Sequence, residues 1–202
     1  MGAHRVIQAL TASLVLLCAP PALSAQSVAA QSVVAPEPTD IIATLNAICV
    51  AAQGDRAQAA ALAAEAGFSP VPESMTPRLR NATERAGFMR TNATDMSIVM
   101  TGRMTRRVGR ETIVLDFCGV AVRPTDHRAL AQRLSDLMKF DSINTVGFDA
   151  YAWLQTPEGR APARSLSDAQ FVAMARTGQM RLLGLDRTGP GSTLIYMLPR
   201  LD

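Results

Sequence analysis

The stretch at residues 111–122, ETIVLDFCGVAV, decides the fold of this chain. It is apolar and β-branched, contains no proline and follows a polar turn at residues 105–110, so it predicts a strand that is buried on at least one face. Residues 95–105 alternate between apolar and polar side chains, which predicts a second strand. The two strands should pair across the turn as a hairpin at the centre of a sheet.

Three helices are predicted on the N-terminal side of this hairpin. Each has a capping residue or a proline at its start and a glycine at its end. The apolar residues of the first helix recur at helical spacing, which predicts that one of its faces packs against the sheet. The expected limits are residue 39 or 40 to residue 54 for the first helix, 56–66 for the second and 76–87 for the third.

The rest of the chain predicts two further helices and three strands. Ser167 and Gln170 form a capping box at the start of the second of these helices. The strands are expected at 146–155, 180–186 and 192–198, and the last two should form a terminal hairpin. The order is then α-α-α-β-β-α-β-α-β-β, which predicts one α+β domain over residues 39–202 with a largely antiparallel sheet. The first of the two helices is capped by Thr125 or Asp126, and its buried face should hold Leu130, Leu134, Leu137 and Met138.

The N-terminal 25 residues have the pattern of a secretory signal peptide. A short basic region precedes an apolar stretch that is too short to span a bilayer, and small residues follow it. We expect cleavage after Ala25, with lipid modification of Cys18 as the alternative that Leu17 disfavours. Residues 26–38 predict a flexible leader. No later stretch has the roughly 20 apolar residues of a membrane helix, so we expect a periplasmic or secreted protein without a transmembrane segment.

Composition limits the partners of the chain. Hydrophobic residues make up 48% and charged residues 18% of the sequence, which is typical of globular proteins. The formal net charge is +3, so the charge balance does not call for nucleic acid. The sequence has no glycine-rich phosphate loop, no C-x-x-C motif and no recognisable metal-ligand spacing. It therefore predicts no cofactor and no metal.

Two cysteines remain once the signal peptide is removed, and they predict a disulfide. Cys49 belongs to the apolar face of the first helix, and Cys118 lies on the central strand. Both should point into the same core, and an exported protein meets oxidising conditions. The alternative is a pair of buried free thiols.

Four arginines gather around the turn of the central hairpin: Arg103, Arg106, Arg107 and Arg110. Guanidinium groups at a hairpin tip can bind an anionic surface or ligand. The alternative is a solvated tip whose charges discourage pairing of strand edges. We favour the solvated tip and keep contact with an anionic surface as the second interpretation.

The strand at 146–155 carries the only Tyr–Trp pair of the chain. Asp149, Tyr151 and Trp153 share one of its faces, opposite Phe148, Ala150, Ala152 and Leu154. An open face of this kind is a platform for sugars or peptides, whereas a face covered by a helix belongs to the core. The strand thus predicts either a ligand face or part of the core, and we favour the core.

A set of short motifs in the first half of the mature chain points to a family. Ile48-Cys49 is followed by Gln53-Gly54-Asp55, an alanine-rich helix, Gly67-Phe68 and later Asp116-Phe117-Cys118. This run resembles a family of uncharacterised small exported proteins of Gram-negative bacteria. The resemblance implies export and paired cysteines, and it implies no activity.

The function expected from these features is that of an exported, non-catalytic binding or scaffolding protein whose ligand or envelope partner the sequence does not define. The rival is a periplasmic hydrolase that uses His127, the single histidine of the mature chain, with Asp116 or Asp126. A structure with His127 in hydrogen-bond reach of a carboxylate and a hydroxyl in a cleft would favour the hydrolase.

Overall fold

The computed structural model describes residues 39–76, 82–145, 148–186 and 191–202, so the predicted signal peptide and leader lie outside the described residues. The helical elements are α1 (Ile41–Thr44), the π-helix η1 (Leu45–Val50), α2 (Arg56–Glu65), the 3₁₀ helix η2 (Glu73–Met75), α3 (His127–Met138) and α4 (Asp168–Arg176). The strands are β1 (Ser69–Val71), β2 (Ala82–Thr91), β3 (Met96–Val108), β4 (Glu111–Arg123), β5 (Ile143–Thr145), β6 (Phe148–Thr156), β7 (Gly159–Pro162), β8 (Met180–Asp186) and β9 (Ser192–Leu201).

All strands belong to one sheet with the order β1-β2-β3-β4-β9-β8-β6-β5, and β7 pairs with β6. Every pairing is antiparallel, and β3 and β4 form the expected hairpin at residues 96–123. The mixed α+β class and the largely antiparallel sheet are therefore confirmed. The order of elements differs from the predicted one for two reasons: β2 takes the place of the second half of the predicted third helix, and β1, β5 and β7 are strands of three or four residues that carry little periodicity.

The predicted third helix is wrong over its second half, where the chain forms β2 instead (residues 77–81 lie outside the described part). Strand β2 pairs with β3, with Gly87 opposite Met100, and a register shift after Thr83 marks a bulge. A side chain at Gly87 would clash with Thr76, whose Oγ1 lies 2.4 Å from the ideal Cβ position. Pairing along the edge of a long hairpin outweighs the weak helical spacing of the alanines here.

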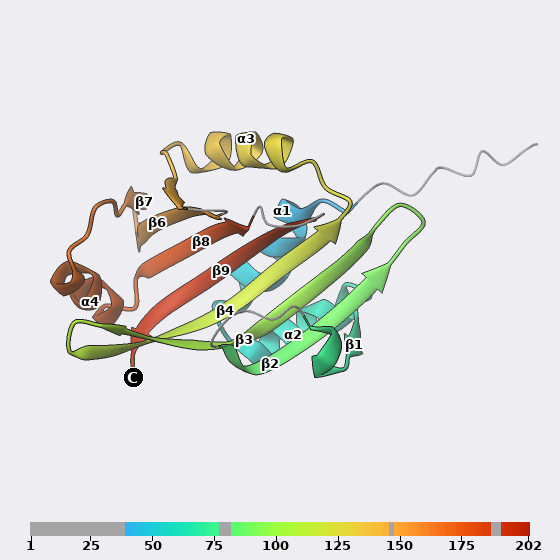
Figure 1. Ribbon diagram of the computed structural model, residues 1–202, viewed down its shortest axis with the longest axis horizontal. Coiled ribbons are helices and arrows are strands. Elements are labelled where there is room, and N and C mark those ends of the chain that lie inside the picture. The colour runs from blue at the N-terminus through green and yellow to red at the C-terminus, as the bar shows by residue number, and fades with distance from the viewer. Residues whose placement is uncertain (1–38, 77–81, 146–147, 187–190) are drawn as a thin grey trace, which may run out of the picture. The chain divides into compact units, whose positions relative to one another are not determined.

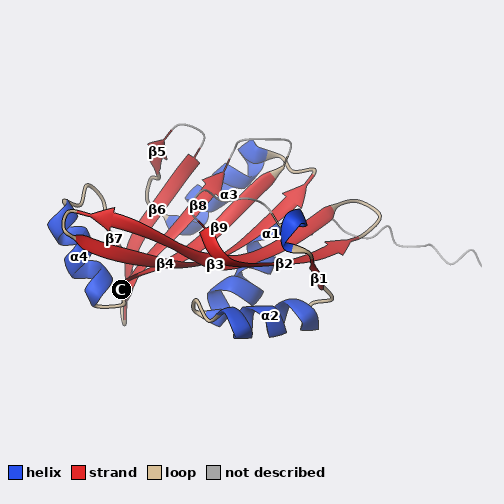
Figure 2. Cartoon of the chain, turned by 60° about the horizontal axis from the view of Figure 1, so that its bottom comes forward, coloured by secondary structure: helices blue, strands red, loops and turns tan. Residues whose placement is uncertain are grey.

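Helices α1, η1, α2 and α3 pack on one face of the sheet. Their apolar side chains form a single buried cluster with the inward residues of β3, β4, β6, β8 and β9. In Figure 1, α1 and α2 lie behind the sheet, and Figure 2 shows α2 on one side of it. Leu137 of α3 is a correction to the predicted buried face, because 42% of this residue is exposed while Leu130, Leu134 and Met138 are buried.

The disulfide between Cys49 and Cys118 is present and ties this helical layer to the sheet. Cys49 lies in the π-helix η1 and Cys118 on β4, with their Cα atoms 5.2 Å apart. Both residues are buried, at 0% and 3% exposure. The predicted cross-link is thus confirmed, and a buried disulfide is typical of an oxidising compartment.

The opposite face of the sheet is covered mainly by its own side chains. Among the residues that the structure describes, the buried cluster of Met100, Phe117, Ala121, Ile195 and Met197 is built from strand residues alone. The Phe117 ring lies against Gly102 and the Phe148 ring against Gly184, at 2.6 and 1.9 Å from the ideal Cβ positions of these glycines. The glycines leave room for these rings against the strands, so this part of the second face is covered by the sheet's own side chains.

Helix α4 packs on this second face, near the tip of the β3–β4 hairpin (Figure 1). Its start is the predicted capping box, in which the Ser167 hydroxyl accepts the backbone N–H of Gln170 and the Gln170 side chain accepts the backbone N–H of Ser167. Phe171, Val172 and Ala175 pack against the ends of β3, β4 and β9. A pocket lies between α4 and the sheet.

Candidate functional site

A pocket of about 380 Å³ lies between α4 and the second face of the sheet. We call it the α4 pocket. This volume falls in the roughly 300–1,000 Å³ range of small-molecule sites, which are mostly apolar with few polar groups. Its lining consists of Arg106, Ile113, Leu115, Ile143, Ala150, Ala152, Ala163, Ser165, Leu166, Phe171, Met180 and Leu182.

Small side chains make the room for this pocket. Ala150 and Ala152 project from β6 to the same side, and Ala163 follows β7. The adjoining strand β8 contributes the longer Leu182 opposite Ala152, so the alanines leave a hollow that longer side chains would fill. The lining comes from both β4 and β6, and in the sheet these two strands are separated by β9 and β8. Because residues of both strands reach the same pocket, the sheet must curl around it.

The rim of the α4 pocket exposes apolar surface. Ile143 on the short edge strand β5 is 44% exposed although it lines the pocket. Ser165 also lines it and holds a left-handed backbone conformation with φ of 51°. Such a conformation is uncommon for a residue other than glycine and is often found at functional sites. The pocket thus combines an apolar body with a structured loop at its edge.

The arginines that the sequence grouped at one turn are divided between the two faces of the sheet. The turn itself is only Gly109 and Arg110, because β3 continues to Val108. Side chains alternate along β3, so Arg103 and Arg107 lie on the face of the sheet that is covered by α1, η1, α2 and α3. Arg106 lies on the opposite face, beside its cross-strand partner Ile113. The four arginines therefore do not share one face of the sheet, and of the four only Arg106 lines the α4 pocket.

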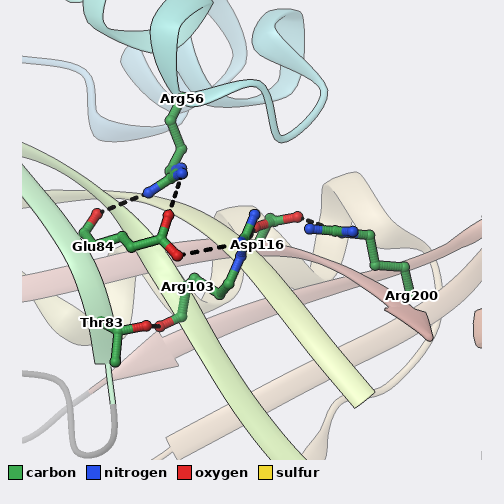
Figure 3. Close-up of polar contacts among 6 residues, drawn as sticks. All are labelled: Arg56, Thr83, Glu84, Arg103, Asp116 and Arg200. Carbon is green, nitrogen blue, oxygen red and sulfur yellow. Dashed lines mark hydrogen bonds and ion pairs between the residues drawn. The ribbon is translucent and has the colours of Figure 1, made fainter. Parts of the chain in front are cut away.

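Arg103 belongs to an ion-pair network on the helical face of the sheet, drawn in Figure 3. Its Nε lies 2.9 Å from Oδ1 of Asp116, while Arg200 Nε lies 2.6 Å from Oδ2 of the same carboxylate. Arg103 also contacts Glu84, which in turn pairs with Arg56 of α2. The network joins β2, β3, β4, β9 and α2, so we interpret it as structural.

The charge of Asp116 is stabilised by these partners. Burial alone would raise the pKa of the Asp116 carboxyl, but the hydrogen bonds and charges of Arg200 and Arg103 outweigh it. The pKa therefore lies below its ordinary value of 3.8. A carboxylate held ionised between two guanidinium groups is poorly suited to act as a general base at neutral pH.

His127 lies at the start of α3, where its Nδ1 is 2.8 Å from the Ser192 hydroxyl. Ser192 is buried at 0% exposure. The two carboxylates considered for a hydrolase are engaged elsewhere, since Asp126 caps α3 through the N–H groups of residues 128 and 129 and Asp116 holds the two arginines. Of the groups that a hydrolase needs, the structure places a hydroxyl next to His127, but this hydroxyl is buried away from solvent.

The strand face of Asp149, Tyr151 and Trp153 is covered. The three residues are 6%, 4% and 5% exposed. Trp153 packs against Tyr196 with ring centroids 6.3 Å apart, and the Arg160 guanidinium lies 5.7 Å from the Trp153 centroid. A hollow of about 110 Å³ remains between these aromatic rings, η1 and α3, which is well below the size of an ordinary ligand pocket of about 300 Å³ or more.

No group of three or more His, Cys, Asp or Glu side chains is placed to hold a metal ion among residues 39–76, 82–145, 148–186 and 191–202. Over the same ranges, no helix has the length and hydrophobicity needed to cross a bilayer.

Comparison with known proteins gives no assignment. No protein-family model matches the chain, and neither the curated proteins nor the solved structures contain a significant match. The resemblance to small exported bacterial proteins stays a prediction, and the geometry of the site carries the functional argument.

Proposed function

We propose that this chain is an exported, non-catalytic binding protein that holds a small apolar ligand in the α4 pocket. One observation carries the proposal: a 380 Å³ hollow with a nearly continuous apolar lining lies between α4 and a sheet face that is otherwise closed by its own side chains. Apolar surface left accessible in a well-packed domain usually serves binding. Export is supported by the signal-like residues 1–25 and by the buried disulfide.

The pocket is tested with a probe that carries no charge. We expect N-phenylnaphthylamine, whose fluorescence rises in apolar surroundings, to bind the mature protein saturably. Replacing Ala150 by Leu fills the pocket from β6, and we expect it to weaken probe binding by at least about tenfold, since a filled pocket offers little apolar surface to bury. The measurement is a fluorescence titration of both proteins.

Ala57→Leu is the matched control, because Ala57 is exposed on α2 and is not one of the residues that line the pocket. This variant should bind the probe like the unaltered protein. Circular dichroism checks that both variants keep the fold. The proposal fails if the unaltered protein shows no saturable binding, or if Ala150→Leu binds as well as Ala57→Leu.

A hydrolase is the second candidate, because His127 Nδ1 and the Ser192 hydroxyl lie within hydrogen-bond distance. In this function Ser192 would be the nucleophile and His127 its base. A buried hydroxyl is a poor nucleophile, so we expect a fluorophosphonate reagent to leave Ser192 unmodified, as read by intact-protein mass spectrometry. Stoichiometric labelling that is lost in both Ser192→Ala and His127→Ala would establish the hydrolase instead.

A further inference from the structure

We infer that the ligand of the α4 pocket is a small carboxylic acid with an apolar body, whose carboxylate is bound by Arg106. This inference rests on the proposed function and adds the chemical class of the ligand. Among the described residues that line the pocket, Arg106 is the only charged one. A pocket with a long apolar wall and one cationic group at its rim matches an amphipathic anion.

The position of Arg106 follows from the register of the central hairpin. Arg106 pairs with Ile113 across β3 and β4, and paired residues point to the same face of a sheet. Ile113 is fully buried at 0% exposure, whereas Arg106 is exposed. The guanidinium therefore stands where the apolar lining meets solvent, which is the place for the polar end of an amphipathic ligand.

Arg106 is also available to a ligand, unlike several other arginines of the sheet. Arg103 and Arg200 share Asp116, and Arg90 donates to the Ala66 carbonyl oxygen at 2.9 Å. Within the part of the chain that the structure describes, no hydrogen bond or ion pair involves the Arg106 guanidinium. Its five N–H donors remain free for an acceptor of suitable geometry.

The number of charges in the pocket favours a carboxylate over a phosphate. A guanidinium presents a planar pair of donors that matches the two oxygens of a carboxylate, and both groups carry one unit of charge. A phosphate monoester carries about −1.5 to −2 at neutral pH, so a single arginine would leave part of its charge uncompensated. The remaining polar lining residue, Ser165, can add one hydrogen bond and no charge.

The test compares decanoate with decanol, which have the same chain and differ in the charged group. We expect decanoate to displace N-phenylnaphthylamine from the unaltered protein at about tenfold lower concentration, the effect of one hydrogen-bonded charge pair that is partly shielded from water. Arg106→Gln should remove this difference by weakening decanoate alone. Arg107→Gln is the matched control, since Arg107 is the exposed neighbour on the other face of β3, and it should behave like the unaltered protein.

The possible results separate this inference from the proposed function. Equal displacement by decanoate and decanol, or an unchanged preference in Arg106→Gln, overturns the inference and leaves the apolar pocket standing. Decyl phosphate that binds more tightly than decanoate overturns the choice of carboxylate. Absence of probe binding overturns the proposed function itself.

Discussion

Removal of the Cys49–Cys118 disulfide is expected to lower the free energy of unfolding by about 4 kcal/mol, the loop-closure value for a bridge of this span. The bridge joins residues 69 apart in sequence, and both are buried. In the folded protein it fixes η1 to β4. In the unfolded chain it holds residues 49 and 118 together and so lowers the conformational entropy of that state. For a domain of this size, we expect the melting temperature to fall by roughly 10 °C.

The variants Cys49→Ala, Cys118→Ala and the double replacement test this bond. Because each breaks the same cross-link, the three should lose nearly equal stability in urea denaturation, and reductant should then have no further effect on any of them. The oxidised parent should lose a similar amount when it is reduced. Losses that add up in the double variant, or two reactive thiols in the unreduced and denatured parent, would contradict the assignment.

Asp116→Asn is expected to cost about 2 kcal/mol at pH 7, the order of magnitude for hydrogen bonds to a partly buried charged group. The replacement keeps the size of the side chain but removes the negative charge between Arg103 and Arg200. The carboxylate that bridges the two guanidinium groups is then lost, and Arg103 keeps only its contact with Glu84. Exposed surface carboxylates should not show this effect.

The same variant should change the pH dependence of stability. The pKa of Asp116 in the folded protein lies below the ordinary value of 3.8, so its contribution is fully present above that pH and is lost as the pH falls through the folded pKa. Asp116→Asn should therefore flatten the acid limb of a stability–pH curve measured from neutral pH downward. Asp95 and Asp40 also have lowered pKa values, so part of the limb should remain.

Asp136→Asn is the control for both effects, because Asp136 is exposed on α3 and accepts a hydrogen bond only from Gln132 among the described side chains. It removes the same charge from the surface. An acid limb that is equally steep in Asp116→Asn and in the parent would show that the network around Asp116 does not contribute to stability.

The parts of the fold that the sequence could predict are those with strong local signals. The long apolar strand at 111–122, the capping residues of α2, α3 and α4 and the paired cysteines all lie where local chemistry placed them. Strand β2 was missed because its alanines fit a helix, and only pairing with β3 determines its conformation. Short strands such as β5 depend entirely on their neighbours.

The candidate site could be predicted only in part. The sequence places Arg106 among the arginines of the hairpin tip, for which anion binding is the second interpretation, but the continuation of β3 to Val108 decides which face Arg106 occupies. The sequence places Ala150 and Ala152 on the strand face opposite Trp153. Two small residues at alternate positions of a strand indicate that the space above that face is incompletely filled. The contribution of α4 and of the loop at Ser165 to the walls depends on tertiary packing, which sequence spacing does not encode.

Methyl NMR of the mature protein during titration with decanoate tests the central claim most directly, because it shows where the ligand binds. The α4 pocket predicts saturable shifts concentrated on the methyl groups of its lining, namely Ile113, Leu115, Ile143, Ala150, Ala152, Ala163, Leu166, Met180 and Leu182. Methyl groups on the helical face, such as Leu183 and Leu194, should move little. Shifts centred on that face, or no saturable shifts at all, would contradict the account.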